Sequence, residues 1–423
     1  MMKKVILIIS FIALITKVQA SFILIPMDDS QKNHLKAYGI AYWALKGELE
    51  IQWLLNYRGG SFLIPNANAV SKECVIRGVG YETISDAQAS AILAEVGNPE
   101  VNQDAVKLEK APRIAVYSPK GKQPWDDAVT LVLKYAEIPY DVLYDEEVYL
   151  EKLKDYDWLH LHHEDFTGQY GKFYGSFHFA AWYQAEVREN EAMAKKLGFS
   201  KVSLMKLNSA KKIKEFVGRG GFLFAMCSAS DSYDIALAAE GIDICASIYD
   251  GDAEDPQANN KIDFSKGFAF ENYKLSMNPL EYEYSTIDTY LTRRQQYGMT
   301  QKNDLFSLFD FSAKWDPVPT MLCQNHTNSI QGFWGQTVAF NKNYIKKNVL
   351  VMGEAKAFNE ARYIHGEFGK GTWTFYGGHD PEDYEHRVEE PPTDLSLHPN
   401  SPGYRLILNN ILFPAAKKKK QKT

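Results

Sequence analysis

Cys227 is the residue of this chain whose neighbours best suit nucleophilic chemistry. It follows the short apolar run 222–226, which a glycine pair precedes, and helix-starting residues come directly after it. The pattern predicts a strand, a sharp turn and a helix, with the cysteine at a helix amino terminus, where backbone N–H groups favour a thiolate. Ala225 and Ala229 are small enough for the tight turn of a nucleophile elbow. A small buried hydrophobic residue is the alternative interpretation of Cys227.

A histidine near the end of the chain could serve as the base for this cysteine. His379 follows a predicted strand and a glycine pair, and Asp380 and Glu382 lie one and three residues beyond it. A cysteine nucleophile needs a base that accepts its proton and a third group that orients the base. His379 would be the base, with Glu382 or Asp380 as the orienting group. Taken alone, the same residues could form a solvated turn.

A second polar group follows another predicted strand and comprises His160, His162, His163, Glu164 and Asp165. These side chains could ligate a metal together with His379 and Asp380, but no spacing matches a zinc signature, and we assign no metal ligand. The ordinary alternative is a core histidine at position 160 and a solvated loop at 164–165.

The same loop has a third interpretation that involves no metal. His162, His163, Glu164 and Asp165 would bind substrate or stabilise an oxyanion beside the cysteine, and Ser228 would be a further substrate-binding residue.

The segments that must position these residues alternate between strand and helix patterns from residue 112 onward. This alternation predicts an α/β fold with a doubly wound, mostly parallel, flavodoxin-like sheet. Ligands of such sheets bind outside the carboxyl ends of the strands. The loops after Ser118 and Leu161 are therefore expected to share one crevice with Cys227. Ser230 and Asp231 are expected to cap a helix over 233–240.

Composition shifts divide the rest of the chain. Residues 21–110 predict a small α+β unit, with a helix over 34–46, a hairpin within 48–63 and a second helix over 85–96. The α/β domain would comprise 111–245 and 346–414. The range 246–345 would be a large insertion, for which a lid is one role. Residues 415–423 form a basic tail.

The first twenty residues have the pattern of a cleaved signal peptide. Lys3 and Lys4 precede the apolar run 5–15, and Ala20 ends a small-x-small cleavage pattern. About eleven apolar residues are too few to span a bilayer, so we expect an exported, periplasmic or extracellular protein without a membrane span. The net charge of −6 argues against general nucleic-acid binding. The four cysteines could form two disulfides, but Cys227 is expected to be free.

These residues resemble the class I glutamine amidotransferase-like superfamily, which also includes ThuA-like proteins and the DJ-1/PfpI group. The resemblance covers roughly 112–245 and 346–412, and rests on the strand at 114–118, the run 211–226 before the cysteine, and Gly-His-Asp-Pro-Glu at 378–382. It implies amide hydrolysis with Cys227 as nucleophile, His379 as base and Glu382 as orienting group. Two residues, rather than the family's one, separate His379 from Glu382, so Asp380 competes for the orienting role.

Over its whole length the chain is also similar to exported bacterial proteins commonly named asparagine synthetase B. The similar stretches are 39–43, 56–62 and 162–171. We do not expect that activity. An asparagine synthetase has an amino-terminal cysteine and an ATP-pyrophosphatase loop, whereas the mature chain would begin at Ser21 and contains no such loop.

The residues therefore predict an exported hydrolase, an amidase or related acyl-transfer enzyme with a Cys–His–acid site and no cofactor. A non-catalytic protein that binds a small molecule, glycan or peptide in the same crevice is the alternative. The aromatic residues of 166–183 and 277–340 suit such binding. A metal-dependent hydrolase is the third interpretation.

Overall fold

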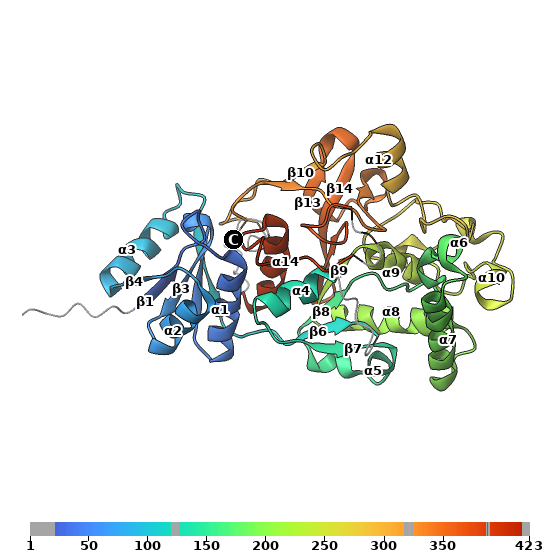
Figure 1. The fold of residues 1–423 in the computed structure, drawn as a ribbon, viewed down its shortest axis with the longest axis horizontal. Coiled ribbons are helices and arrows are strands. Elements are labelled where there is room, and N and C mark those ends of the chain that lie inside the picture. Colours follow the sequence, from blue (N-terminus) through green and yellow to red (C-terminus); the bar gives the residue numbers. More distant parts are fainter. Residues whose placement is uncertain are drawn as a thin grey trace, which may run out of the picture.

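The computed structural model describes residues 22–119, 127–316, 321, 325–385, 387 and 390–416. The predicted signal peptide and most of the basic tail lie outside the described residues. Two β-sheets form the frame of the molecule, and the smaller, amino-terminal sheet lies at one end of the long axis (Figure 1, blue).

The smaller sheet has five antiparallel strands in the order β4-β1-β3-β2-β5. The strands are β1 (Phe22–Ile25), β2 (Ile51–Leu55), β3 (Ser61–Pro65), β4 (Glu82–Ile84) and β5 (Asp104–Leu108). The helices of this unit are α1 (His34–Lys46), α2 (Asn68–Arg77) and α3 (Asp86–Gly97). The predicted helix at 34–46 is confirmed as α1. It starts there because the Asn33 side chain accepts the Lys36 N–H and so caps it. Ser85 and Gln88 form a capping box that starts α3.

The larger sheet begins with five parallel strands in the order β7-β6-β8-β9-β15. Their bounds are β6 (Ile114–Tyr117), β7 (Asp141–Leu143), β8 (Trp158–Leu161), β9 (Phe222–Met226) and β15 (Gly371–Tyr376). Counted along the chain this order is 2-1-3-4-5, which is the order of flavodoxin-like sheets. The same sheet then continues with antiparallel strands, so it is mixed as a whole, and the flavodoxin-like class stays a prediction.

The antiparallel half contains β14 (Glu360–Phe368), β13 (Leu350–Ala355), β10 (Leu305–Leu308) and β11 (Ser329–Gln331), and β12 (Phe340–Asn341) pairs with β14. Three of these strands belong to the range 246–345, which the sequence pattern marks as an insertion. This range is thus joined to the larger sheet by backbone hydrogen bonds.

Helices cover both faces of the parallel strands because strand side chains alternate between the faces. Phe224 of β9 packs in a hydrophobic cluster with α4 (Ala128–Tyr135) and α14 (Pro402–Leu412). Its neighbour Leu223 packs in a second cluster with α5 (Asp145–Tyr149), α8 (Val202–Gly218) and α9 (Ser228–Ala238). The first cluster also includes Tyr38 and Trp53, so one core joins the two sheets, with α14 between them (Figure 1).

The remaining α-helices of the described residues lie in the excursions between strands. They are α6 (Tyr174–Phe177), α7 (Ala181–Lys196), α10 (Ser247–Asp250), α11 (Ala258–Lys261) and α12 (Tyr290–Gln296). Within the described parts of the chain, no helix has the length and apolar character needed to cross a membrane.

The helix expected over 233–240 starts earlier than predicted. It is α9, which begins at Ser228, directly after Cys227. The prediction was wrong because the Cys227 carbonyl accepts the Ser230 N–H at 3.2 Å and the Ser230 hydroxyl at 2.6 Å. Ser230 is therefore bound inside the first turn and does not cap a later helix.

Candidate active site

A cavity of about 1700 Å³ lies at the carboxyl ends of the parallel strands. One lining residue follows each of the five strands: Pro119 after β6, Tyr144 after β7, His163 after β8, Cys227 after β9 and His379 after β15. This is the edge at which parallel sheets bind ligands. The cavity is therefore the candidate site.

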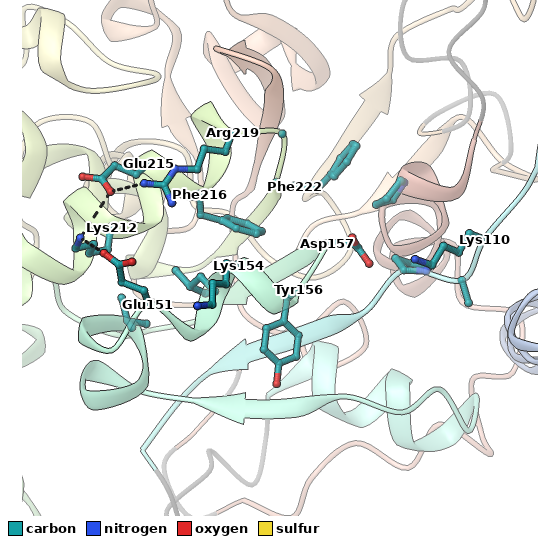
Figure 2. Close-up of a pocket in the computed structure, with 17 residues that line it drawn as sticks. Lys110, Glu151, Lys154, Tyr156, Asp157, Lys212, Glu215, Phe216, Arg219 and Phe222 are labelled. Atoms are coloured by element: carbon teal, nitrogen blue, oxygen red, sulfur yellow. Dashed lines mark hydrogen bonds and ion pairs between the residues drawn. The ribbon is translucent and has the colours of Figure 1, made fainter.

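A smaller cavity of about 370 Å³ lies near the opposite, amino ends of the same strands. Its lining includes Asp157, just before β8, and Phe222, the first residue of β9 (Figure 2). Glu215 there pairs with Arg219 at 3.3 Å and with Lys212 at 3.7 Å. These are ordinary surface ion pairs, and the lining contains no histidine or cysteine.

The backbone at Cys227 is held in a conformation that favours glycine. Its φ is 50° and its ψ is −142°, between the end of β9 and the start of α9. A non-glycine residue in such a region is strained, and strain of this kind clusters at functional sites. The turn places the cysteine against the cavity, as a nucleophile elbow does.

The Cys227 side chain is 2% exposed and its sulfur is hydrogen-bonded to backbone. The Gln336 N–H donates to Sγ at 3.3 Å. Burial raises the pKa of the Cys227 thiol to about 11, although the N–H groups of Thr337, Gln336 and Ser228 act in the opposite direction. The resting side chain is thus a thiol that needs a base.

Cys227 is a free cysteine, as are the buried Cys74 and Cys245, and Cys323 lies outside the described residues.

One loop, residues 334–337, contacts both Cys227 and His379. The His379 N–H donates to the Trp334 carbonyl at 2.8 Å, two residues before the Gln336 N–H that reaches Sγ. A Cβ atom on Gly335 would lie 2.9 Å from the His379 nitrogen, so the two segments are in close contact. The loop therefore fixes the cysteine and histidine segments relative to each other.

The loop is also fixed to α9. The Thr337 hydroxyl donates to the Asp231 carboxylate at 2.9 Å, and burial raises the pKa of Asp231 to about 7. Sequence reasoning missed Gln336 and Thr337, since they belong to a range whose role was not evident. The only sign in the sequence that this range contributes to a binding site was its content of aromatic residues.

Three histidines meet beside the cavity. The ring centroids of His162 and His379 are 4.1 Å apart at an interplanar angle of 82°, and those of His162 and His163 are 4.9 Å apart at 84°. His163 and His379 lie 6.0 Å apart and nearly parallel. One ring nitrogen from each of the three lies within 4.8 Å of the other two. The structure thus brings together two parts of the sequence that are more than two hundred residues apart.

A buried carboxylate, that of Asp127, lies next to His162 of this cluster and next to His160. Asp127 Oδ2 is 3.3 Å from His160 Nε2, and Asp127 Oδ1 is 3.7 Å from His162 Nδ1. Burial opposes the charge on Asp127, but His160 holds the pKa of this carboxyl below its usual value. Asp127 also caps α4 by accepting the N–H groups of Val129 and Thr130. His160 is fully buried, so this histidine lies in the core, as its alternative interpretation stated.

The two predicted orienting carboxylates, Asp380 and Glu382, contact groups other than the His379 ring. Asp380 accepts the Glu382 N–H at 2.9 Å and the Thr393 hydroxyl at 2.8 Å, and burial raises its pKa. Glu382 Oε2 is 3.0 Å from His398 Nδ1. Glu382 lines the cavity, whereas Asp380 is buried beside it.

The predicted substrate-binding residues also lie at this edge. Burial raises the pKa of Glu164 to about 8, although the carboxylate accepts the His162 N–H at 3.1 Å. Asp165 accepts the N–H and hydroxyl of Thr167 and so shapes its own loop.

Ser228, the last predicted substrate-binding residue, is fully buried and its hydroxyl donates to the His163 carbonyl at 3.3 Å. Its backbone N–H is the part that approaches the Cys227 thiol.

The lining of the cavity is rich in aromatic and acidic side chains, with Lys196, Lys206 and Arg387 as its basic residues. Aromatic lining residues are Tyr144, Tyr170, Phe173, Phe177, Trp182, Tyr282, Tyr290, Trp334 and Tyr384. Acidic lining residues are Glu146, Glu147, Glu164, Asp165, Glu186, Glu189, Glu382, Asp383, Glu385 and Glu390. Such walls suit a ligand with apolar faces and several hydrogen-bond donors.

Two further groups of potential metal ligands occur in the described residues. One is Asp127 with His160 and His162, beneath the histidine cluster. The other is Asp243, Cys245 and Asp250, but Lys201 already pairs with Asp243 at 2.6 Å and with Asp250 at 3.0 Å. The lysine supplies the positive charge in that second group.

Comparison with known proteins assigns the chain to no family. No family model matches the chain, and no curated protein matches it. Similar solved structures include two proteins of Salmonella typhimurium described as cytoplasmic, at 9% and 11% identity with TM-scores of 0.33 and 0.32; each comparison covers 72% of this chain and 100% of the other. The β-galactosidase from Bacillus circulans sp. alkalophilus is similar at 12% identity and a TM-score of 0.25, over 64% of this chain and 29% of that chain.

Proposed function

We propose that this protein is an exported, cysteine-dependent hydrolase that cleaves an amide or a related acyl bond. The observation that carries the proposal is the conformation of Cys227, which is held in a strained turn between β9 and α9 and lines the same cavity as His379. The resemblance to class I amidotransferase-like proteins gives the same two residues the same roles.

The reaction would proceed by acyl transfer to the thiol. His379 accepts the Sγ proton as sulfur attacks the carbonyl carbon, and the resulting imidazolium returns this proton to the leaving amine when the C–N bond breaks. A water molecule then attacks the thioester, with His379 again as base, and releases the carboxylic acid and the free thiol.

Backbone N–H groups beside the thiol would stabilise the developing oxyanion. In an elbow site the N–H of the residue after the nucleophile has this role, and here that residue is Ser228. Its hydroxyl is bound to the His163 carbonyl, which fixes the first turn of α9 against the loop after β8. The N–H group therefore has a defined position.

The test uses 4-nitrophenyl acetate as a small activated acyl donor, because the natural substrate is not needed to detect a thioester. We expect a burst of 4-nitrophenolate that is stoichiometric with the protein, and an acetyl group that mass spectrometry locates on Cys227. Cys227→Ala should abolish both. His379→Ala should slow acylation by about 10²–10⁴-fold. Cys245→Ala is the matched control, since Cys245 is equally buried but does not line the cavity.

A glycan-binding protein without catalysis is the second candidate, and the aromatic wall of the cavity favours it. Trp182, Tyr282 and Trp334 all line the cavity. A sugar could stack on such rings. Glycan binding that persists in a protein whose Cys227 is never acylated would favour this second function.

A further inference from the structure

The cluster of His162, His163 and His379 has the donor chemistry of a metal site. The three nitrogens lie within 4.8 Å of one another. Zinc binds imidazole nitrogen at about 2.0–2.1 Å in tetrahedral sites, which places neighbouring ligand nitrogens about 3.3 Å apart. Rotation of the imidazole rings would have to close this difference. Neutral imidazole is a ligand that suits zinc and its neighbours in the first transition row.

A second feature supports a metal site. Histidine ligands of zinc commonly place their other ring nitrogen against a carboxylate, which orients the ring. Beside His162 this carboxylate is the buried Asp127, whose Oδ1 lies 3.7 Å from Nδ1, an electrostatic contact that is longer than a hydrogen bond. With Nδ1 beside Asp127, Nε2 would be the His162 nitrogen that binds the ion. The amino terminus of α4 holds Asp127 in place, so the orienting group is itself fixed.

The cluster is reachable from the cavity. His163 and His379 both line it, and His163 is half-buried, whereas His162 is 1% exposed. An ion bound by the three nitrogens would therefore keep a fourth position directed toward the cavity. Three protein ligands with an open position are typical of accessible zinc sites.

We infer that His162, His163 and His379 bind a divalent transition-metal ion such as Zn²⁺, and that the bound ion switches off the thiol chemistry. The second half of this inference rests on the proposed function. A His379 nitrogen that is coordinated to a cation cannot accept the Cys227 proton. Metal binding and acylation would thus exclude each other.

The direct experiment is a calorimetric titration of ZnCl₂ into the full chain after treatment with EDTA. We expect one ion per chain. His163→Ala should weaken binding by about 100-fold, the upper end of the loss seen when even an outer-shell partner is removed. His178→Ala is the control, because His178 is exposed and lies outside the cluster. Equal binding by the wild type and both variants would overturn the inference.

Zinc X-ray absorption identifies the ligands without reference to activity. We expect nitrogen neighbours at about 2.0–2.1 Å and no sulfur at about 2.3 Å. Cys227→Ala should bind Zn²⁺ as the wild type does. A sulfur ligand, or loss of binding in Cys227→Ala, would show that the thiol belongs to the metal site and would contradict the assignment to three histidines.

The two proposals fail in different ways. If 4-nitrophenyl acetate acylates Cys227 and Zn²⁺ does not bind, the metal site is wrong and the hydrolase proposal stands. If Zn²⁺ binds to the histidines but no acylation occurs without metal, the hydrolase proposal is wrong and the metal site stands. The full inference expects acylation in EDTA, its loss with one equivalent of Zn²⁺, and its return when EDTA is added again.

Discussion

The backbone conformation of Cys227 distinguishes this residue from an ordinary buried cysteine in a regular helix or strand. At its φ of 50°, an L side chain is strained and glycine is not. Cys227→Gly should therefore be more stable than Cys227→Ala by about 1 kcal/mol or more. Free energies of unfolding from urea titrations measure this difference.

Cys74 provides the matched control for this comparison. It is also a fully buried cysteine, but it lies in the regular helix α2. There Cys74→Gly should be less stable than Cys74→Ala by about 1 kcal/mol, because glycine disfavours helix. The same order of stability at both positions would contradict the strained turn.

A buried histidine gives the protein a defined sensitivity to acid. His365 lies in β14, its Nδ1 is 2.9 Å from the Thr374 hydroxyl, and burial lowers its pKa to about 3. The unfolded chain would bind a proton near pH 6.5, whereas the folded chain would not. The stability that His365 contributes is thus present above pH 6.5 and is lost as pH falls toward 3.

His365→Gln should remove this part of the pH dependence. Between pH 6.5 and pH 5 the wild type should lose about 2 kcal/mol more than the variant in free energy of unfolding. His178→Gln, at an exposed site, should retain the wild-type profile. Parallel profiles for the wild type and His365→Gln would show that His365 is protonated equally in both states.

At the scale of elements, the loop 334–337 decides the geometry of the site. Gly335→Ala would place a Cβ atom 2.9 Å from the His379 backbone nitrogen and 3.1 Å from its Cβ, so the loop and the His379 segment must shift relative to each other. A shift of about 1 Å can cost about 10²-fold in rate. We expect this loss in the acylation rate of Cys227, which stopped-flow detection of 4-nitrophenolate would measure.

Gly97→Ala is the control for this substitution. Gly97 ends α3, far from the cavity, and no atom lies within 4 Å of a Cβ added there. The variant should acylate at the wild-type rate. An unchanged rate in Gly335→Ala would mean that the loop does not set the position of His379.

The regular elements were predictable because their signals are local. The helix at 34–46 has its Asn33 cap, and the strand at 222–226 has its preceding glycine pair and its apolar run. The position of Cys227 at a strand end followed from the same signals. The early start of α9 was not predictable, since it depends on the Ser230 hydroxyl binding the Cys227 carbonyl instead of capping.

The loop 334–337 could not be predicted from local pattern. Its place depends on contacts with residues distant in sequence, such as Asp231 and His379. The histidine cluster was only partly predictable. The strand pattern placed His162 and His163 at a carboxyl end, but it gave no sign that Asp127 lies beneath them.

At the scale of the whole molecule, buried charges join the antiparallel half of the sheet to the site. Asp304 accepts two bonds from Arg293 at 2.7 and 2.8 Å and two from Arg362 at 2.8 and 2.9 Å. Arg362 also donates to the carbonyls of Phe333 and Val338 at 2.9 Å, on either side of the loop 334–337. The range 246–345 is thus coupled to the Cys227 site.

Arg362→Met should lower the free energy of unfolding by about 3–5 kcal/mol, because it leaves buried charge and buried carbonyls without their partner. It should also slow acylation, although Arg362 does not line the cavity. Urea unfolding and the 4-nitrophenolate burst measure the two effects. Arg219→Met, which breaks the exposed pair with Glu215, should change stability by less than about 1 kcal/mol and leave the burst intact.

The most direct test of the central claim is acylation of Cys227 by 4-nitrophenyl acetate, measured in EDTA and mapped by mass spectrometry. The strained turn, the shared cavity and the loop that contacts both segments predict one acetyl group per chain on Cys227, absent in Cys227→Ala and strongly slowed in His379→Ala. An unmodified Cys227 in the wild type, or acylation that is unchanged in His379→Ala, would contradict the assignment of this site to a cysteine hydrolase.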